Sequence, residues 1–193
     1  FSKNFGPYQY RQVRIVEFPR YQSFAQAFPN TIPYSESVGF IARIGSNDID
    51  YPFYVTAHEI AHQWWAHQVV GSDQQGSTVL SETLAQYSAL MVMEKMYGRE
   101  QIRRFLKQEL DRYLSSRGTE RLEEMPLIRV EDQPYIYYQK GGLVMYLLRD
   151  QIGEEAVNRA LRRVLAQYAF KGAPYPRSLY LIAAIRAEAP ADK

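Results

Sequence analysis

The 193-residue sequence predicts an α+β fold in which a small β-rich portion is followed by helices. Two observations support this prediction. Short segments with strand composition occur before residue 50, whereas longer segments with helical patterning, separated by Gly and Pro, occur after it. We therefore expect one domain over residues 1–193, with a β-rich part at 1–50 and a helical part at 51–193.

Two strands are expected in the β-rich part. Residues Arg11–Phe18 (RQVRIVEF) alternate polar and apolar side chains, and Pro19 ends the run. Residues Ser37–Ile44 (SVGFIARI) are rich in β-branched and aromatic side chains and form the second candidate. The segment 45–52 (GSNDIDYP) then predicts a turn, with Pro52 suited to the first turn of a helix.

The helical part divides at glycines and prolines. Gly71, Gly98 and Gly153 each follow a helix-length segment, and a connecting region over 117–134 contains two prolines. The predicted helices span Phe53–Val70, Ser77–Tyr97, Glu100–Ser116, Ile136–Ile152, Glu154–Phe170 and Arg177–Glu188.

Composition narrows the possible functions. The net charge of +2 is too small to suggest nucleic acid or an anionic membrane as partner. The absence of cysteine excludes disulfides, thiolate metal sites and thiol nucleophiles. The sequence starts at Phe1 instead of Met, so we expect it to be an excised piece of a longer protein. Membrane association would then depend on parts missing from this chain, and the native compartment stays open.

All three histidines of the chain lie within ten residues, in the segment HEIAHQWWAH. On a helix, His58 and His62 lie on one face, about 5–6 Å apart at Cβ, and can hold one metal ion. Glu59 lies about 100° round the helix, near the metal but outside the ligand row, where a general base is needed. His67 follows His62 by five positions and points away, so we expect a structural role for it. Imidazole and carboxylate ligands suit zinc.

A third ligand is suggested by isolated charge. Glu59 is the only formally charged residue from Tyr51 to Val70, and Glu82 is the only one from Val79 to Met93. Both segments are apolar on more than one face and should be largely buried. A buried carboxylate is costly unless it is paired or binds a metal. Glu82 is therefore the best candidate for the third ligand, whereas a helix that merely carries histidines would leave its charge unexplained.

These residues resemble a known family. HEIAHQWW followed by LSETLAQY is similar to the M1 aminopeptidase family of gluzincin metallopeptidases, in which HExxHxW precedes a helix with the ligand glutamate and a tyrosine five residues later. Within the family the sequence resembles bacterial M1-like domains, some of which form part of larger membrane proteins. The resemblance covers roughly residues 1–170 and implies a thermolysin-like catalytic domain that binds Zn²⁺.

Two further segments carry the resemblance. The segment YQKGG (138–142) is similar to the family's Y-x-K-G element, which implies that Tyr138 donates a hydrogen bond to the oxyanion. The segment YSESVGFI (34–41) is similar to the family's G-x-M-E-N segment, which implies that Glu36 binds the α-amine of the substrate. Departures are present, because Ser81 replaces the usual asparagine and Pro33–Tyr34 replace a Gly-Ala pair.

The resemblance implies a zinc metallopeptidase acting on peptides, and Glu36 favours an aminopeptidase that removes N-terminal residues. Two alternatives stay open. The altered amine-binding segment is compatible with a thermolysin-like endopeptidase, and so are the 19 residues between His62 and Glu82, a spacing that resembles that of thermolysin. The absence of the family's flanking domains from this chain is compatible with a zinc-stabilised peptide-binding or regulatory module that does not cleave.

Overall fold

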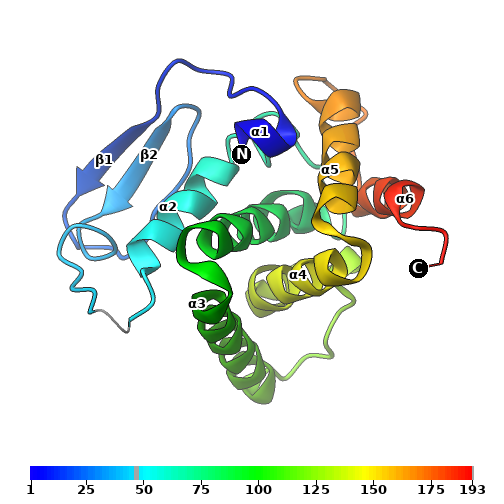
Figure 1. Cartoon of the computed structure of the whole chain (residues 1–193). Coiled ribbons are helices and arrows are strands. Elements are labelled where there is room, and N and C mark those ends of the chain that lie inside the picture. Colours follow the sequence, from blue (N-terminus) through cyan, green and yellow to red (C-terminus); the bar gives the residue numbers. More distant parts are fainter. Residues whose placement is uncertain (46–47, 193) are drawn as a thin grey trace.

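The structure is a computed structural model that describes residues 1–45 and 48–192 (Figure 1). It is mostly helical, with one small two-stranded sheet, as the sequence predicts. The sheet lies on one side of α2, and the remaining long helices lie on the other side (Figure 1). The helices are α1 (Ser2–Phe5), α2 (Tyr51–Ala61), α3 (Leu84–Thr119), α4 (Gly141–Ile152), α5 (Glu154–Tyr168) and α6 (Ser178–Glu188).

The sheet pairs β1 (Arg14–Phe18) with β2 (Thr31–Ser35) in parallel, and Val16 lies opposite Pro33. The first predicted strand is confirmed in its second half. The second, Ser37–Ile44, is wrong, because the chain turns after Ser35, whose carbonyl accepts from two following amides. The prediction missed β2 because this strand contains Pro33. Proline cannot donate a backbone hydrogen bond within a sheet and is therefore uncommon inside strands. The apolar run after β2 stays largely exposed.

The first long helix ends earlier than predicted. α2 stops at Ala61 instead of Val70, and the chain then makes a set of tight turns. Adjacent tryptophans explain the stop. Trp64 packs against the ring of Phe1 and donates to the carbonyl of Gly6, whereas Trp65 is fully buried and donates to Ser88 Oγ at 3.0 Å. A turn lets both indoles reach separate buried partners.

The later helices follow the prediction with shifted boundaries. The predicted break at Gly98 is a kink inside α3, where this glycine has a φ of 81° that favours glycine. Short π-helical turns, η1 (Val79–Thr83) and η3 (Ile136–Lys140), precede α3 and α4, and a 3-10 turn, η2 (Leu127–Arg129), lies in the connecting region. A four-residue helix at the N-terminus, α1, was not predicted.

The predicted turn at 45–52 includes Ser46 and Asn47, which lie outside the described residues. At its end Asp50 caps α2 by accepting from the amide of Phe53 at 2.9 Å, and Pro52 occupies the first turn as expected. Across the described ranges, none of the helices combines the length and the apolar composition that a bilayer crossing requires.

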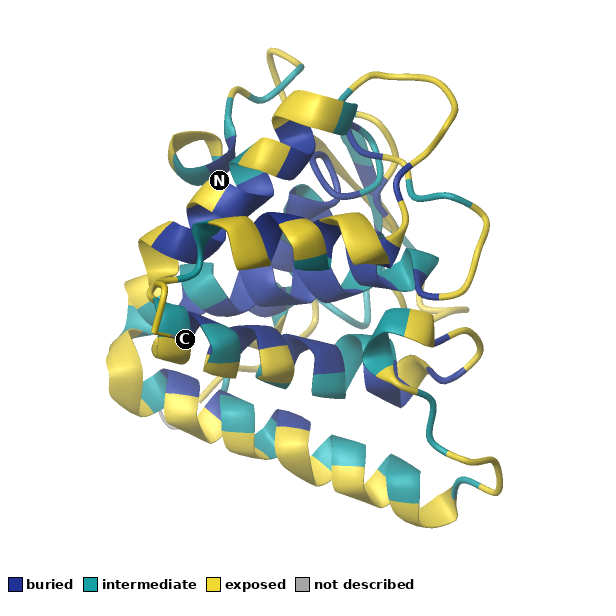
Figure 2. Ribbon diagram, turned by 90° about the vertical axis from the view of Figure 1, so that its right-hand side faces the viewer, coloured by how far each residue is buried: buried dark blue, intermediate teal, exposed yellow. Residues whose placement is uncertain are grey.

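Two clusters of buried apolar side chains meet along α3. The larger joins its first turns to α5 and α6 and includes Trp65, Tyr87 and Leu161. The smaller joins α2 to α3 on both sides of the kink at Gly98, and in it the rings of Tyr54 and Phe105 lie 4.5 Å apart. Figure 2 shows the result, with exposed outer faces and buried inner faces on the stacked helices. α3 therefore acts as the central helix of the domain.

Two glycines let α4 approach α3 closely. A Cβ on Gly141 would lie 2.5 Å from Thr83 Oγ1, and a Cβ on Gly142 would lie 2.7 Å from Gln86 Cγ. Real Cβ atoms do not approach that closely, so this contact requires glycine at both positions. The glycines of the YQKGG segment thus set the distance between the helix that begins after Tyr138 and the helix that begins after Glu82.

Gly142→Ala is expected to destabilise the protein by about 1–3 kcal/mol, because the added methyl group overpacks the α3–α4 contact. Gly118→Ala is the matched control, since nothing lies within 4 Å of a Cβ there. Within α3 this change should be neutral or stabilising by up to about 1 kcal/mol. Urea unfolding of both variants measures the difference. Equal midpoints would contradict the assigned close contact.

Candidate active site

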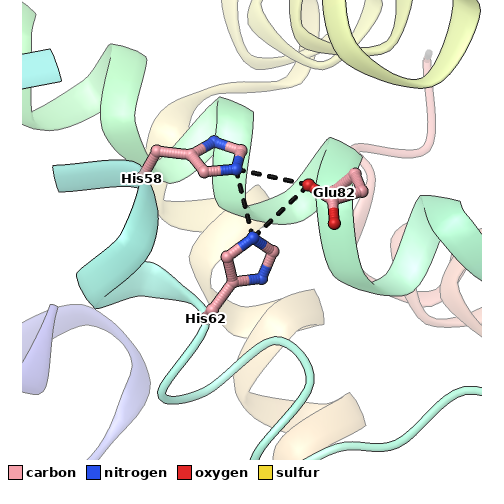
Figure 3. Close-up of side chains that lie close together, drawn as sticks. All are labelled: His58, His62 and Glu82. Carbon is pink, nitrogen blue, oxygen red and sulfur yellow. Dashed lines mark hydrogen bonds and ion pairs between the residues drawn. The ribbon is translucent and has the colours of Figure 1, made fainter. Parts of the chain in front are cut away.

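Three buried or half-buried side chains converge between α2 and η1 (Figure 3). His58 Nε2 and His62 Nε2 lie 3.1 Å apart, and Glu82 Oε2 lies 3.3 and 3.4 Å from them. One ligand atom from each residue lies within 4.8 Å of the other two. Two imidazole nitrogens and one carboxylate oxygen facing one point form a donor set that suits zinc.

The early end of α2 orients one of these imidazoles. His62 Nδ1 lies 2.9 Å from the carbonyl oxygen of Trp65, to which it donates. In a continuing helix that carbonyl would accept from the amide of Val69, but this amide instead donates to Trp64. The bond fixes the tautomer that leaves Nε2 as an acceptor, as is usual for metal-ligating histidines. The turn at 62–65 therefore belongs to the site.

The charges of the three residues are strongly coupled. Burial alone would raise the pKa of Glu82, but hydrogen bonds and charge from His58 and His62 hold it well below the ordinary value. Burial alone would lower the pKa of His62, but contact with Glu82 raises it above 6.5. The arrangement thus favours an ionised carboxylate in a largely buried position, which is the state that can bind a cation.

Glu59 lies beside this group and faces a cleft of about 340 Å³. Its side chain is buried, and burial raises its pKa, while the two neighbouring histidines act in the opposite direction. The backbone of Ala27 also acts to lower this pKa. A carboxylate with a raised pKa at the edge of a cleft has the properties of a general base.

A buried glutamine holds the strand edge above Glu59. Gln63 accepts from the amide of Asn30 at 2.9 Å and donates to the carbonyl of Phe28 at 3.0 Å. These two bonds fix the turn that follows Ala27 against the end of α2. Tyr34 adds a second attachment by donating to the carbonyl of Pro52 at 3.0 Å. The small sheet is therefore anchored directly to the helix that carries the histidines.

Tyr138 reaches the same cleft from η3. Its ring lies 5.9 Å from the ring of His58, and both side chains line the cleft with Glu59. Burial, followed by the nearby charge of Glu82, raises the pKa of the Tyr138 hydroxyl, which therefore stays protonated and able to donate. The next lysine, Lys140, points elsewhere and pairs with Glu124. Lys140 is accordingly absent from the described lining of the cleft.

Glu82 and Tyr138 both lie on π-helical turns, and these two turns contact each other. Thr83 Oγ1 donates to the carbonyl of Tyr137 at 2.6 Å and so links η1 to η3. π-Turns are rare and occur frequently at functional sites, because the wider turn redirects side chains. Neither turn could be predicted from the sequence, since the composition of both segments is that of an ordinary helix.

Glu36 and His67 are not part of this group. Glu36 is half-buried at the end of β2, and the described lining of the cleft includes Val38 but not Glu36. Its predicted contact with a substrate amine stays a prediction. His67 is half-buried, and burial lowers its pKa. As expected, it is absent from the described cluster of potential metal ligands.

Comparison with known proteins agrees with this geometry. A family model described as the Peptidase family M1 domain matches residues 2–181. Human endoplasmic reticulum aminopeptidase 2 is 26% identical over 125 residues, a match that covers 62% of this chain and 13% of that protein. The chain thus spans a small part of the curated relative.

Solved structures share the fold. An M1 zinc metallopeptidase from Deinococcus radiodurans matches with a TM-score of 0.73 and 21% identity over 97% of this chain and 38% of that one. Yeast leukotriene A4 hydrolase matches with a TM-score of 0.76 and 17% identity over 100% of this chain and 31% of that one. Because the family model matches most of its length, the chain belongs to peptidase family M1.

Proposed function

We propose that this chain is the catalytic domain of a zinc-dependent metallopeptidase, and that it acts as an aminopeptidase. The observation that carries the proposal is the meeting of His58, His62 and Glu82 at one point beside a cleft lined by Glu59 and Tyr138. The names of its relatives support it, since they include an aminopeptidase and an M1 zinc metallopeptidase bound to a Tyr-Ser-Ala substrate.

The finer description of the fold belongs to the same proposal. Residues 1–193 would form a single catalytic domain of thermolysin-like architecture, of the kind found in bacterial M1-like proteins. The sheet anchored to α2 through Gln63 and Tyr34 favours one folding unit over two. The chain covers 38% of the Deinococcus structure, so activity of the whole protein would involve further parts.

Zinc fits the residues that are present. His58, His62 and Glu82 supply three protein ligands, which is the number found in catalytic zinc sites that keep one position open. When bound there, zinc would polarise the scissile carbonyl and lower the pKa of a water molecule toward about 7. The remaining steps fall to side chains of this chain.

Glu59 acts as the general base and then as the general acid. It takes a proton from the attacking water and delivers it to the amine that leaves. Its raised pKa lets the carboxyl group hold that proton between the two steps. The Tyr138 hydroxyl donates a hydrogen bond to the oxyanion of the tetrahedral intermediate, a contribution on the order of 3 kcal/mol to the transition state.

The role of Glu36 distinguishes an aminopeptidase from an endopeptidase. If its carboxylate binds the α-amine of the substrate, one residue is removed per cut. The second candidate is an endopeptidase, which needs no amine anchor and with which Pro33–Tyr34 in place of the Gly-Ala pair would be compatible. The third candidate is a zinc-stabilised module that binds peptides without cleavage, in which Glu59 has no chemical role.

Glu82→Ala is expected to abolish or strongly weaken zinc binding, because it removes one of three ligands. Glu17→Ala, which removes an exposed carboxylate from β1, is the control and should keep zinc at the wild-type level. Metal content after dialysis against a weak chelator measures both. Full zinc retention by Glu82→Ala would refute the ligand assignment.

Glu59→Gln should keep zinc and lose activity by a factor of about 10² to 10⁴, because the proton acceptor is gone. Tyr138→Phe should also keep zinc and lose about 10² to 10³ in kcat, since it removes one oxyanion donor. Steady-state kinetics on short peptides, with metal content measured in parallel, tests both. Wild-type zinc content with no hydrolysis by the unmodified chain would favour the non-catalytic module.

Peptides with a free N-terminus should be cleaved faster than the same peptides with an acetylated N-terminus. Glu36→Gln should raise KM for free-amine peptides about ten- to a hundredfold, because a charged hydrogen bond is lost. Glu17→Gln provides the matched control and should leave KM unchanged. Equal turnover of free and acetylated peptides would establish the endopeptidase instead.

A further inference from the structure

A second buried carboxylate lies behind the wall of the cleft. Glu109, on α3 beyond the kink, is 2% exposed. Its Oε2 accepts from Gln86 Nε2 at 3.0 Å, and its Oε1 accepts from Arg112 Nη1 at 3.3 Å. The nearby side chain of Gln139 acts to lower the pKa of this carboxyl group, against the effect of burial. The mechanism proposed above gives this charged group no role.

Both side chains that donate to Glu109, and the neighbouring Gln139, line the cleft. Gln86, Arg112 and Gln139 share that lining with His58, Glu59 and Tyr138. They come from different segments, because Gln86 lies one turn after Glu82 and Gln139 directly follows Tyr138. Glu109 itself is outside the described lining. It therefore works as an anchor that fixes a polar wall next to the reacting groups.

The ion pair with Glu109 does not use all the N–H groups of Arg112. A guanidinium carries five N–H groups, and the ion pairs found among the described residues give Arg112 one partner, Glu109. Its Cζ lies 5.4 Å from the ring centre of Tyr51, which holds the planar group against an aromatic wall. The side chain is 41% exposed, so its other N–H groups can reach a ligand.

We propose that Arg112, fixed by Glu109 and Tyr51, binds a carboxylate of the substrate in this cleft. The inference rests on the proposed peptidase function and adds the substrate class, namely short acidic peptides. Arginine suits this task because its planar fork matches a carboxylate with two parallel hydrogen bonds. The carboxylate has two sources, an Asp or Glu side chain or the free C-terminus of a short peptide.

The test measures binding to zinc-loaded Glu59→Gln protein, so that the probes are not consumed. Ala-Gln amide is the neutral reference. Ala-Glu amide adds a side-chain carboxylate, Ala-Gln with a free C-terminus adds a terminal one, and Ala-Lys amide reverses the charge. At least one carboxylate probe should bind about tenfold or more tightly than the reference, as expected for a charged hydrogen bond. The probe that gains identifies the source.

Variants of the arginine decide the assignment. Adding Arg112→Gln should remove the preference, whereas Arg112→Lys should keep part of it, since it retains the charge without the fork. Arg103→Gln is the matched control, because it removes an exposed arginine of α3 that is absent from the described lining. Zinc content and thermal midpoint verify that each variant is folded.

Equal binding of all four probes, or a preference that survives Arg112→Gln, would overturn the carboxylate subsite. This outcome differs from failure of the proposed function. If the wild-type chain cleaves neutral peptide amides as readily as peptides that carry either carboxylate, the peptidase stands and the subsite is refuted. If the zinc-loaded chain neither cleaves nor binds any of the peptides, both proposals fail.

Discussion

The structure depends on placing a carboxylate of one buried helix against two imidazoles of another. Glu82 would be costly at this depth without partners, and His58 and His62 supply them within 3.4 Å. The contacts between the carboxylate and the imidazoles outweigh the effect of burial on each group. The pKa of Glu82 therefore falls and that of His62 rises. Contacts far from these atoms serve to keep the two helices in this position.

Close packing between helix backbones keeps these two helices in place. Gly141 and Gly142 bring α4 against the start of α3, and Thr83 joins the two π-turns by one short hydrogen bond. As a result Glu82 and Tyr138, which are far apart in sequence, lie on adjoining turns, and Tyr138 lines the cleft. On the other side Gln63 ties the sheet edge to the end of α2. The site is thus built from segments that are far apart in the chain.

Glu82 and Glu109 are stabilised in different ways. Glu82 is half-buried and faces two imidazoles, whereas Glu109 is buried and accepts hydrogen bonds from Gln86 and Arg112 of the cleft wall. The kink at Gly98 redirects the second half of α3 toward this wall. α3 therefore begins directly after the turn that carries a proposed metal ligand, and its second half supports a proposed substrate subsite.

The sequence by itself determined the metal-site pattern, because spacing on a helix and isolated charge in an apolar segment act locally. These two local features were sufficient to predict the group formed by His58, Glu59, His62 and Glu82. The helices were predicted for the same reason, as was the break at Gly98. What only the tertiary structure decided were the features set by distant partners: the strand that contains Pro33, the end of α2 at Ala61, the π-turns and the group around Glu109. Each depends on contacts between segments far apart in the chain, and local composition does not encode them.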